Sequence, residues 1–350
     1  MTGASGPSRG ACLAYLQKNR SFDMKCFDAH SDIWTDVTIK RMKGETNVFH
    51  NHHFERLCKG GVEGSILVLW VDPPHTRDYG IRTHEIFRCV TDEIAEAKDF
   101  RIVKSYDEMI KAREDGVFYI MIGVEGMAYA SYDPTFAKLD EYYDFGARHG
   151  MLTWNEENGF GHSAASGSTE GLSDLGKKAV LHMIEKKMIV DTSHLNEAGF
   201  WDIARIMDGR PFIASHSDCK KFSVHPRNLT DDQLRAIRDA NGCVGLNAWN
   251  EFLDNDPMKG DINRLADHAE HMIDVMGIDH VGCGFDFCGF LGDPDDPEVY
   301  SGMDAVTWGL EDSSKIPHLF EIFRERGMRE DEIEKIAFGN FHRIVKEVVG

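Results

Sequence analysis

The sequence lacks any hydrophobic run long enough to cross a membrane. A transmembrane helix needs about 18 or more successive apolar residues, and no segment of the chain reaches that length. The opening segment, MTGASGPSRG, is small and polar and has no apolar core of the kind that signal peptides carry. We therefore expect a cytoplasmic protein with no membrane as a partner.

Closely spaced cysteines and clusters of positive charge are missing as well. The eight cysteines form no CxxC motif, which predicts free thiols in a reducing compartment. The formal net charge of -20 repels phosphate backbones, and no stripe rich in lysine and arginine offsets it. We therefore expect no nucleic-acid partner, and solubility is the simplest explanation of the acidity.

The composition is that of a globular protein with a sizeable core. Hydrophobic residues make up 42% and charged residues 28% of the 350-residue chain. Because no repeat, low-complexity tract or flexible linker divides it, we expect one domain over residues 1–350, with an N-terminal extension over 1–20 and closing helices over 315–350 that complete the outer ring. The oligomeric state does not follow from the sequence, and a homodimer is compatible with it.

Eight short β-rich segments recur along the chain, with room for a helix between them. This pattern is typical of βα units and a parallel sheet, and eight such units predict an α/β fold of the (β/α)8 or TIM-barrel type. Several of the intervening helices begin at Ser, Thr or Asp, which favour helix N-caps. The strands are predicted at 24–30, 65–71, 118–126, 151–154, 188–194, 211–217, 242–249 and 280–287, and the clearest helices at 83–97, 105–115, 173–187, 230–240 and 261–276.

Imidazole and carboxylate side chains gather at the C-terminal ends of five predicted strands, where barrel enzymes place their active sites. His30 and Asp32 are two residues apart, so strand alternation directs both to the same side. This mixture of ligands is what a hydrolytic zinc-type site requires. The other such residues are Glu125, His194, His216 and Asp286.

Each of these residues alone has a simpler explanation, since a single histidine at a strand end is commonly a hydrogen-bonded core residue and a single glutamate can cap a helix. Their coincidence favours the metal site. The HNHH cluster, which contains His50, His52 and His53, falls in a predicted loop and is interpreted as a polar surface patch. Three further histidines stay unassigned: His162, His225 and His318.

The order of motifs along the sequence resembles that of the membrane (renal) dipeptidase family, peptidase family M19 of the amidohydrolase superfamily. DAHSD is similar to the family's opening HxD motif, RLCKGGVEGSILVLWV to the segment before its second strand, and GVEG to the motif with its bridging glutamate. VDTSHLN, ASHS, PRNLTDDQLRAI, GFDF and FGNFHRI then follow in the family's order. The resemblance extends over nearly the whole barrel, from residue 26 to residue 345.

The resemblance implies a binuclear metal-dependent dipeptidase that cleaves dipeptides with a hydroxide bridging two divalent ions, which we expect to be Zn²⁺. It makes His30 and Asp32 ligands of one ion. It makes His194 and His216 ligands of the other ion. Glu125 matches the carboxylate that bridges both.

The resemblance also implies roles at the substrate. Arg227 matches the arginine that holds the substrate's C-terminal carboxylate, and Asp286 matches the acid that transfers the catalytic proton and faces the free amine. The chain departs from vertebrate members after the strand-four Leu-Thr, where Trp154 replaces a histidine that binds the substrate carbonyl. An indole N–H donates one hydrogen bond but no proton, so Trp154 either substitutes in part, signals a different substrate, or lines the pocket wall. Asn155 and Asn158 are neighbouring amides that can contribute.

Two other kinds of function stay open. A different amidohydrolase, acting on N-acyl amino acids, lactones or cyclic amides, would use the same metal pair. A non-catalytic binding protein would keep the barrel and lose turnover through changes such as Trp154. A nucleotide-binding sheet is disfavoured, because no GxGxxG motif follows a strand and opens a helix.

Overall fold

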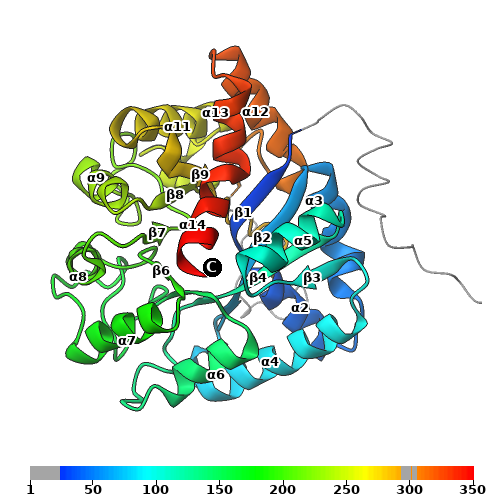
Figure 1. Ribbon diagram of the computed structural model, residues 1–350, viewed down its shortest axis with the longest axis vertical. Coiled ribbons are helices and arrows are strands. Elements are labelled where there is room, and N and C mark those ends of the chain that lie inside the picture. Colours follow the sequence, from blue (N-terminus) through cyan, green and yellow to red (C-terminus); the bar gives the residue numbers. More distant parts are fainter. Residues whose placement is uncertain (1–23, 293–300, 302–305) are drawn as a thin grey trace, which may run out of the picture.

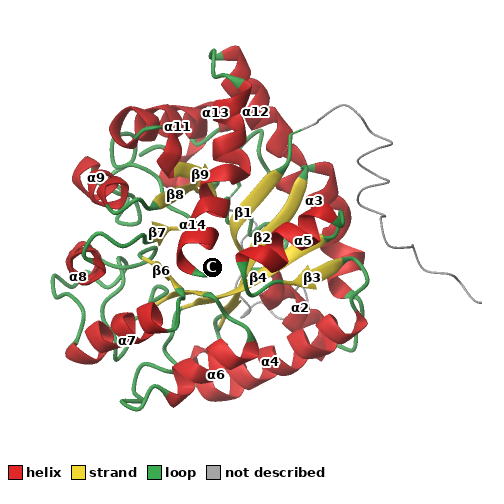
Figure 2. Cartoon of the chain, viewed as in Figure 1, coloured by secondary structure: helices red, strands yellow, loops and turns green. Residues whose placement is uncertain are grey.

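Parallel strands enclosed by helices make up the fold in the computed structural model, which describes residues 24–292, 301 and 306–350. Eight strands follow one another in the order β1-β2-β4-β5-β6-β7-β8-β9 as a nearly closed barrel (Figures 1 and 2), which confirms the predicted (β/α)8 fold. The predicted extension over residues 1–20 lies outside the described residues. The strands are β1 (Cys26–Ser31), β2 (Val62–Trp70), β4 (Phe118–Glu125), β5 (His149–Met151), β6 (Ile189–Asp191), β7 (Ile213–Ala214), β8 (Cys243–Leu246) and β9 (Val281–Cys283).

The helices lie mainly outside the barrel (Figure 2). Four of the predicted N-caps are confirmed, since Ser105, Ser173, Thr230 and Asp261 each accept a backbone N–H of the first helical turn. Within the described residues, no helix has both the length and the apolar character needed to cross a bilayer. The α-helices are α2 (Ile33–Met42), α3 (Glu55–Lys59), α4 (Tyr79–Glu96), α5 (Tyr106–Glu114), α6 (Ala137–Phe145), α7 (Asp174–Glu185), α8 (Glu197–Met207), α9 (Asp231–Asp239), α10 (Asn250–Leu253), α11 (Ile262–Met276), α12 (Ile316–Glu325), α13 (Glu330–Glu334) and α14 (Asn340–Val348).

Two hydrophobic layers follow from the alternation of side chains along the strands. In β2, Ile66 and Val68 point into the barrel, while the alternate residues Leu67 and Leu69 pack against the outer helices. In β4, Tyr119 and Met121 point inward in the same way. Every second residue of β4 points inward, so Glu125, the last residue of the strand, also points inward. It lies at the mouth of the barrel that the C-terminal ends of the strands form.

The last helix closes the other end of the barrel. Phe341, Ile344 and Val345 of α14 pack against the inner residues at the starts of the strands, and the Asn340 side chain donates a hydrogen bond to the Val281 carbonyl at 2.7 Å. In Figure 1, α14 accordingly lies over the centre of the ring of strands. Of the closing helices predicted over 315–350, α12 lies beside α11 in the outer ring, but α14 covers the barrel's end instead.

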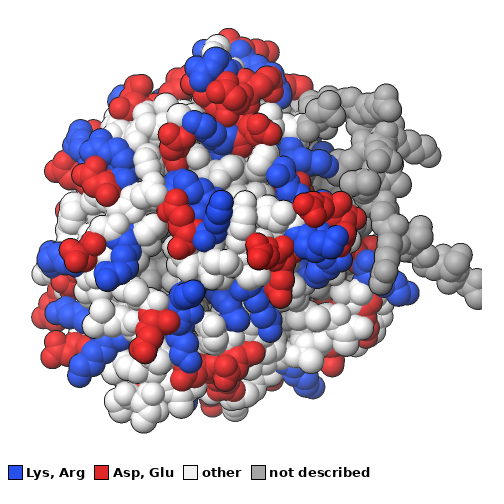
Figure 3. All heavy atoms as spheres, viewed as in Figure 1, with Lys and Arg blue, Asp and Glu red and all other residues white. Residues whose placement is uncertain are grey.

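Acidic and basic side chains are interspersed on the face around α14 (Figure 3). Typical pairs there are Arg343 with Glu347 at 3.7 Å and Arg113 with Glu63 at 2.7 Å. Ion pairs near the surface contribute at most about 1 kcal/mol each to the free energy of unfolding when solvent reaches them. The two hydrophobic layers are therefore the main source of the barrel's stability.

Several predicted strands are too long, and one strand was not predicted. The short strand β3 (Phe100–Ile102) pairs with β4 beside the barrel path, and its middle residue is exposed, so it carries no buried-strand pattern. The strands predicted over 188–194, 211–217 and 280–287 end early, at Asp191, Ala214 and Cys283. Most of the residues beyond them are buried, but they lie in loops and not in strands.

Candidate active site

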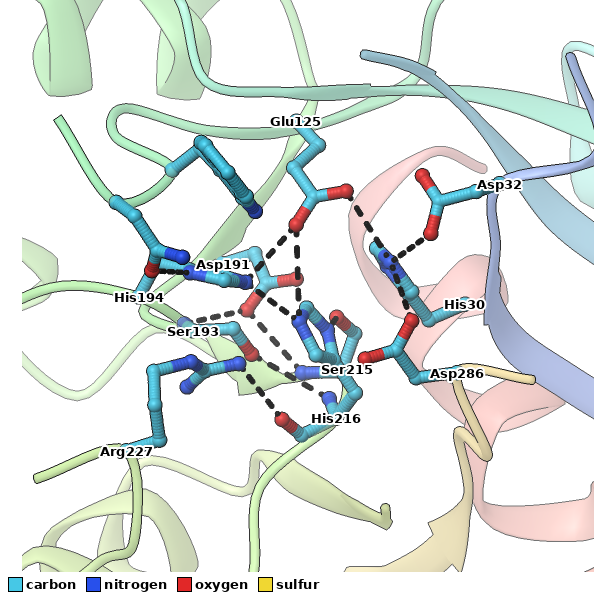
Figure 4. A network of polar contacts seen from close by, with 12 residues as sticks. His30, Asp32, Glu125, Asp191, Ser193, His194, Ser215, His216, Arg227 and Asp286 are labelled. Atoms are coloured by element: carbon cyan, nitrogen blue, oxygen red, sulfur yellow. Dashed lines mark hydrogen bonds and ion pairs between the residues drawn. The ribbon is translucent and has the colours of Figure 1, made fainter. Parts of the chain in front are cut away.

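A cavity of about 230 Å³ opens at the C-terminal ends of the strands, and four of the six polar residues predicted to form the site line it. The other two, His30 and His216, contact these four (Figure 4). Trp70, Trp154, Trp249 and Phe252 form much of the cavity's apolar wall. The polar residues come from the ends of β1, β4, β6, β7 and β9, as the sequence predicts: His30, Asp32, Glu125, His194, His216 and Asp286.

The first group of possible metal ligands contains His30, Asp32 and Glu125. His30 Nε2 lies 3.3 Å from Glu125 Oε2 and 3.7 Å from Asp32 Oδ2. Strand alternation is not what brings His30 and Asp32 together, because β1 ends at Ser31 and Asp32 begins helix α2 as its N-cap. The predicted pair is therefore adjacent because the chain turns from strand into helix between its two members.

The second group contains His194, His216 and the other oxygen of Glu125. His194 Nε2 lies 2.9 Å from Glu125 Oε1 and 3.0 Å from His216 Nε2, and His216 Nε2 lies 3.8 Å from the same oxygen. One carboxylate oxygen thus faces each group of ligands, which is the arrangement that a carboxylate bridging two ions requires.

The hydrogen bonds of the imidazoles show that these groups suit a cation. His194 Nδ1 bonds to Asn155 Oδ1 at 3.0 Å, and His216 Nδ1 bonds to Ser215 Oγ at 2.8 Å. Since an amide oxygen only accepts, His194 carries its proton on Nδ1 and presents a lone pair at Nε2. His30 is fully buried, its Nδ1 has no hydrogen-bond partner, and its Nε2 faces the carboxylates of Glu125, Asp32 and Asp286. Imidazole nitrogens and carboxylates that face one another fit divalent ions of the Zn²⁺ type.

Burial also sets the charge balance of the site. It raises the pKa of Glu125 to about 8 and that of Asp286 to about 6, because it disfavours the charged carboxylate. It lowers the pKa of His194 and of His216 well below the usual range, which favours the neutral, metal-binding imidazole. The carboxylates therefore need compensating cations to stay charged, as a metal centre supplies.

Two of the site residues have a left-handed backbone conformation. His194 has φ 67° and Asp286 has φ 57°, in a region that non-glycine residues adopt only at an energetic cost. These residues lie in the loops just after β6 and β9, and both side chains line the cavity. Backbone strain of this kind is concentrated at functional sites, and here it positions two of the predicted groups.

Arg227 forms one wall of the cavity and is only 6% exposed. Its Nη1 donates to Ser217 Oγ at 3.3 Å and its Nη2 donates to the His216 carbonyl at 3.1 Å. No ion pair joins Arg227 to an acidic residue in the described part of the chain. The guanidinium is therefore held by neutral partners and is suited to binding an anion in the cavity.

Comparison with known proteins decides the family. The sequence profile of the membrane dipeptidase family, peptidase family M19, matches residues 18–349. The chain belongs to this family. Membership confirms the resemblance and makes the chain a metal-dependent dipeptidase, a hydrolase acting on peptide bonds.

Individual relatives of this M19 dipeptidase cover most of its length. An uncharacterized protein in the pqqA 5' region of Klebsiella pneumoniae is 33% identical over 258 residues, which are 71% of this chain and 89% of that protein. A solved metallopeptidase of family M19, dipeptidase AC, is 24% identical with a TM-score of 0.82 and is matched over 94% of this chain and 100% of its own. A metallopeptidase from Rhodobacter sphaeroides, solved with a phosphinate mimic of the dipeptide L-Ala-D-Ala, is 24% identical with a TM-score of 0.80, over 93% and 99% of the two chains.

The remaining predicted residues of the M19 site differ in their placement. Trp154 lies on the cavity wall, with its ring 4.9 Å from that of Trp70 and 6.3 Å from that of His194. Asn155 also lines the cavity, but its oxygen is bonded to His194, so its amide orients the His194 imidazole. Asn158 does not line the cavity, because its amide donates to the Leu152 carbonyl at 2.8 Å.

The interpretation of the HNHH cluster as a surface patch in a loop is wrong for His53. The cluster lies in the short π-helix η1 (Phe49–Phe54), and His53 is buried with its Nε2 2.8 Å from Asp36 Oδ2. His50 and His52 are partly exposed and bond to Asp99 and Glu45. A buried carboxylate on α2, which the local sequence does not reveal, holds His53 inside.

Asp191 is a supporting residue that the sequence did not single out. Its Oδ1 accepts the backbone N–H groups of Ser193 at 2.8 Å and Ser215 at 3.1 Å, the residues directly before His194 and His216. Burial opposes its ionisation, but hydrogen bonds from His149 and these neighbours lower the pKa of Asp191 to about 2. The Asp191 carboxylate therefore holds the two loops that carry His194 and His216. Its position in the sequence, three residues before His194, could have identified it as a supporting residue.

Proposed function

We propose that the chain hydrolyses dipeptides at a binuclear metal centre. His30 and Asp32 bind one divalent ion, His194 and His216 bind the other, and Glu125 binds both. The observation that carries this proposal is the position of Glu125, whose two oxygens face two different groups of ligands (Figure 4). Zn²⁺ is the ion we propose, since imidazoles and carboxylates are the ligands of its hydrolytic sites.

When bound, such a metal pair supplies hydroxide at neutral pH and polarises the substrate carbonyl. The chain's own residues orient the substrate and move the proton. Arg227 binds the C-terminal carboxylate of the dipeptide with its planar guanidinium. Asp286 faces the free amine, accepts a proton from the attacking water and delivers it to the departing nitrogen. A small cavity with an anion-binding wall suits a two-residue substrate better than a longer peptide.

Metal content is the first test of this proposal. We expect about two divalent ions per chain in the fully loaded protein, because four proposed ligands are arranged in two groups around a fifth, the shared carboxylate of Glu125. Elemental analysis measures this number, and removal of the ions by a chelator should abolish hydrolysis until Zn²⁺ is restored. A fully active protein that binds no more than one ion would reject the binuclear centre.

Substrate chemistry separates the proposal from the other amidohydrolases. A dipeptidase that faces the substrate's amine should cleave free dipeptides and fail on their N-acetylated forms, whereas an N-acyl amino acid hydrolase should show the reverse preference. Because the Rhodobacter sphaeroides structure holds a mimic of L-Ala-D-Ala, the panel should include dipeptides with a D-residue in the second position. The cytoplasmic location and the homodimer stay predictions.

Substitution of Trp154 tests how the carbonyl oxygen is stabilised. Trp154 packs beside Trp70 as part of the wall, so we expect Trp154→His to change kcat by less than about 10-fold, which is under about 1.4 kcal/mol. Steady-state assays on dipeptides measure the effect, with Trp249→His as a matched loss of another indole from the same cavity. A gain of about 100-fold or more, the scale of one oxyanion donor, would show that the wild-type site serves a different substrate.

A further inference from the structure

Cys288 lies in the same cavity, and the proposed reaction makes no use of it. The residue is only 6% exposed and follows Asp286 by two positions in the loop after β9. Its Sγ lies 3.3 Å from Asp286 Oδ1 and 3.8 Å from Asp32 Oδ2. Of the seven buried cysteines in the described residues, Cys288 alone belongs to a cluster of three possible metal ligands.

The separations around Cys288 match those between ligands of one ion. Bonds of about 2.3 Å from zinc to sulfur and about 2.0–2.2 Å to oxygen place two ligands at a tetrahedral angle roughly 3.5 Å apart. The two sulfur-to-oxygen distances, 3.3 and 3.8 Å, bracket that value. The distance from His30 Nε2 to Asp32 Oδ2, which is 3.7 Å, is of the same size.

A second observation points to an ion at this position. The fully buried His30 faces three carboxylates with its Nε2, since Glu125 Oε2 lies at 3.3 Å and Asp32 Oδ2 and Asp286 Oδ1 each lie at 3.7 Å. Asp32 Oδ1 is buried without a hydrogen-bond partner. The sulfur therefore lies beside carboxylate oxygens of Asp32 and Asp286, and both of these carboxylates also face His30 Nε2.

We propose that the Cys288 sulfur, as a thiolate, ligates the ion held by His30 and Asp32. This inference rests on the proposed metal centre. As the sulfur-to-metal bond forms, the S–H bond breaks and its proton leaves to solvent. A thiolate is a soft ligand, so it makes this half of the centre selective for Zn²⁺ or Cd²⁺ over Mn²⁺ and Mg²⁺. The two halves of the centre would then differ in chemistry, with sulfur on one side and two imidazoles on the other.

Loading the full-length protein with Co²⁺ tests this ligation directly. A thiolate bound to Co²⁺ gives an intense near-ultraviolet charge-transfer band, so we expect the band in the wild type and its loss in Cys288→Ser. Cys89→Ser is the matched control, because Cys89 is equally buried but lies on the outer helix α4. In competition with a chelator, Cys288→Ser should release one of two ions at least about tenfold more readily, and Cd²⁺ should lose its advantage over Mn²⁺ at that position.

The outcomes separate this inference from the proposed function. A wild-type protein that binds two Co²⁺ ions and cleaves dipeptides, but lacks the thiolate band, would overturn the ligation and leave the binuclear dipeptidase intact. Cys288 would then be only a weak hydrogen-bond donor to Asp286. A protein that binds one ion and shows the band would keep the ligation and reject the binuclear centre. The wild-type spectrum decides even where Cys288→Ser does not fold.

Discussion

Replacing Asp286 with asparagine should lower kcat for dipeptide hydrolysis by about 10²–10⁴-fold, the contribution of a positioned acid or base. Asp286 Oδ1 lies 3.7 Å from His30 Nε2 and its Oδ2 lies 3.4 Å from Asn247 Nδ2, so the carboxylate is held beside the proposed metal ligands. Asparagine keeps the shape of the side chain and tolerates the left-handed backbone at this position. The change therefore removes the proton acceptor without new backbone strain.

The measurement is kcat together with metal content, so that loss of a proton acceptor is distinguished from loss of an ion. Asp208→Asn is a matched control, because Asp208 also has a left-handed backbone, with φ 48°, but is exposed at the end of α8. The control should keep wild-type activity. If Asp286→Asn retained two ions and lost less than tenfold in kcat, another group would have to carry the proton.

The convergence of the proposed ligands could be predicted, because it depends only on local patterns and one rule of topology. Parallel strands in a barrel place all their C-terminal ends at one mouth, so histidines and carboxylates at several strand ends must approach one another. Glu125 continues the inward series of Tyr119 and Met121, and the sequence alone shows that spacing. His194 and His216 lie at the C-terminal end of the barrel, as predicted, but neither belongs to a strand. Each lies in a loop beyond its strand, and Asp191 holds both loops.

What could not be predicted depends on contacts between distant segments. The apolar side chains of α14 have the same spacing whether the helix packs against the outside of a sheet or across a barrel's end, so Phe341 and Ile344 do not indicate which partner they meet. His53 is buried because Asp36, on another helix, accepts its hydrogen bond. Cys288 was grouped with the free thiols, because only the folded loop after β9 brings its sulfur to Asp32 and Asp286.

Arg227→Ala should lower kcat/KM for free dipeptides by more than about 100-fold, which corresponds to about 3 kcal/mol of lost charge-assisted binding in the transition state. The guanidinium is buried, its hydrogen-bond partners are a hydroxyl and a backbone carbonyl, and it faces the cavity. A substrate carboxylate would be its first anionic partner. Arg227→Lys should show a smaller loss, because lysine keeps the charge but cannot form two parallel hydrogen bonds.

Arg227→Ala can also lower activity indirectly, by disturbing the structure, and a comparison of two kinds of substrate separates the two effects. Arg227 Nη2 donates to the carbonyl of His216, so removing the side chain can also displace a metal ligand. Displacement would slow every substrate equally, whereas loss of a carboxylate clamp would spare dipeptides whose C-terminus is amidated, since they carry no carboxylate to bind. We therefore expect Arg227→Ala to penalise free dipeptides far more than amidated ones while metal content stays unchanged. Equal losses on both kinds of substrate would reject the clamp and assign Arg227 to the support of His216.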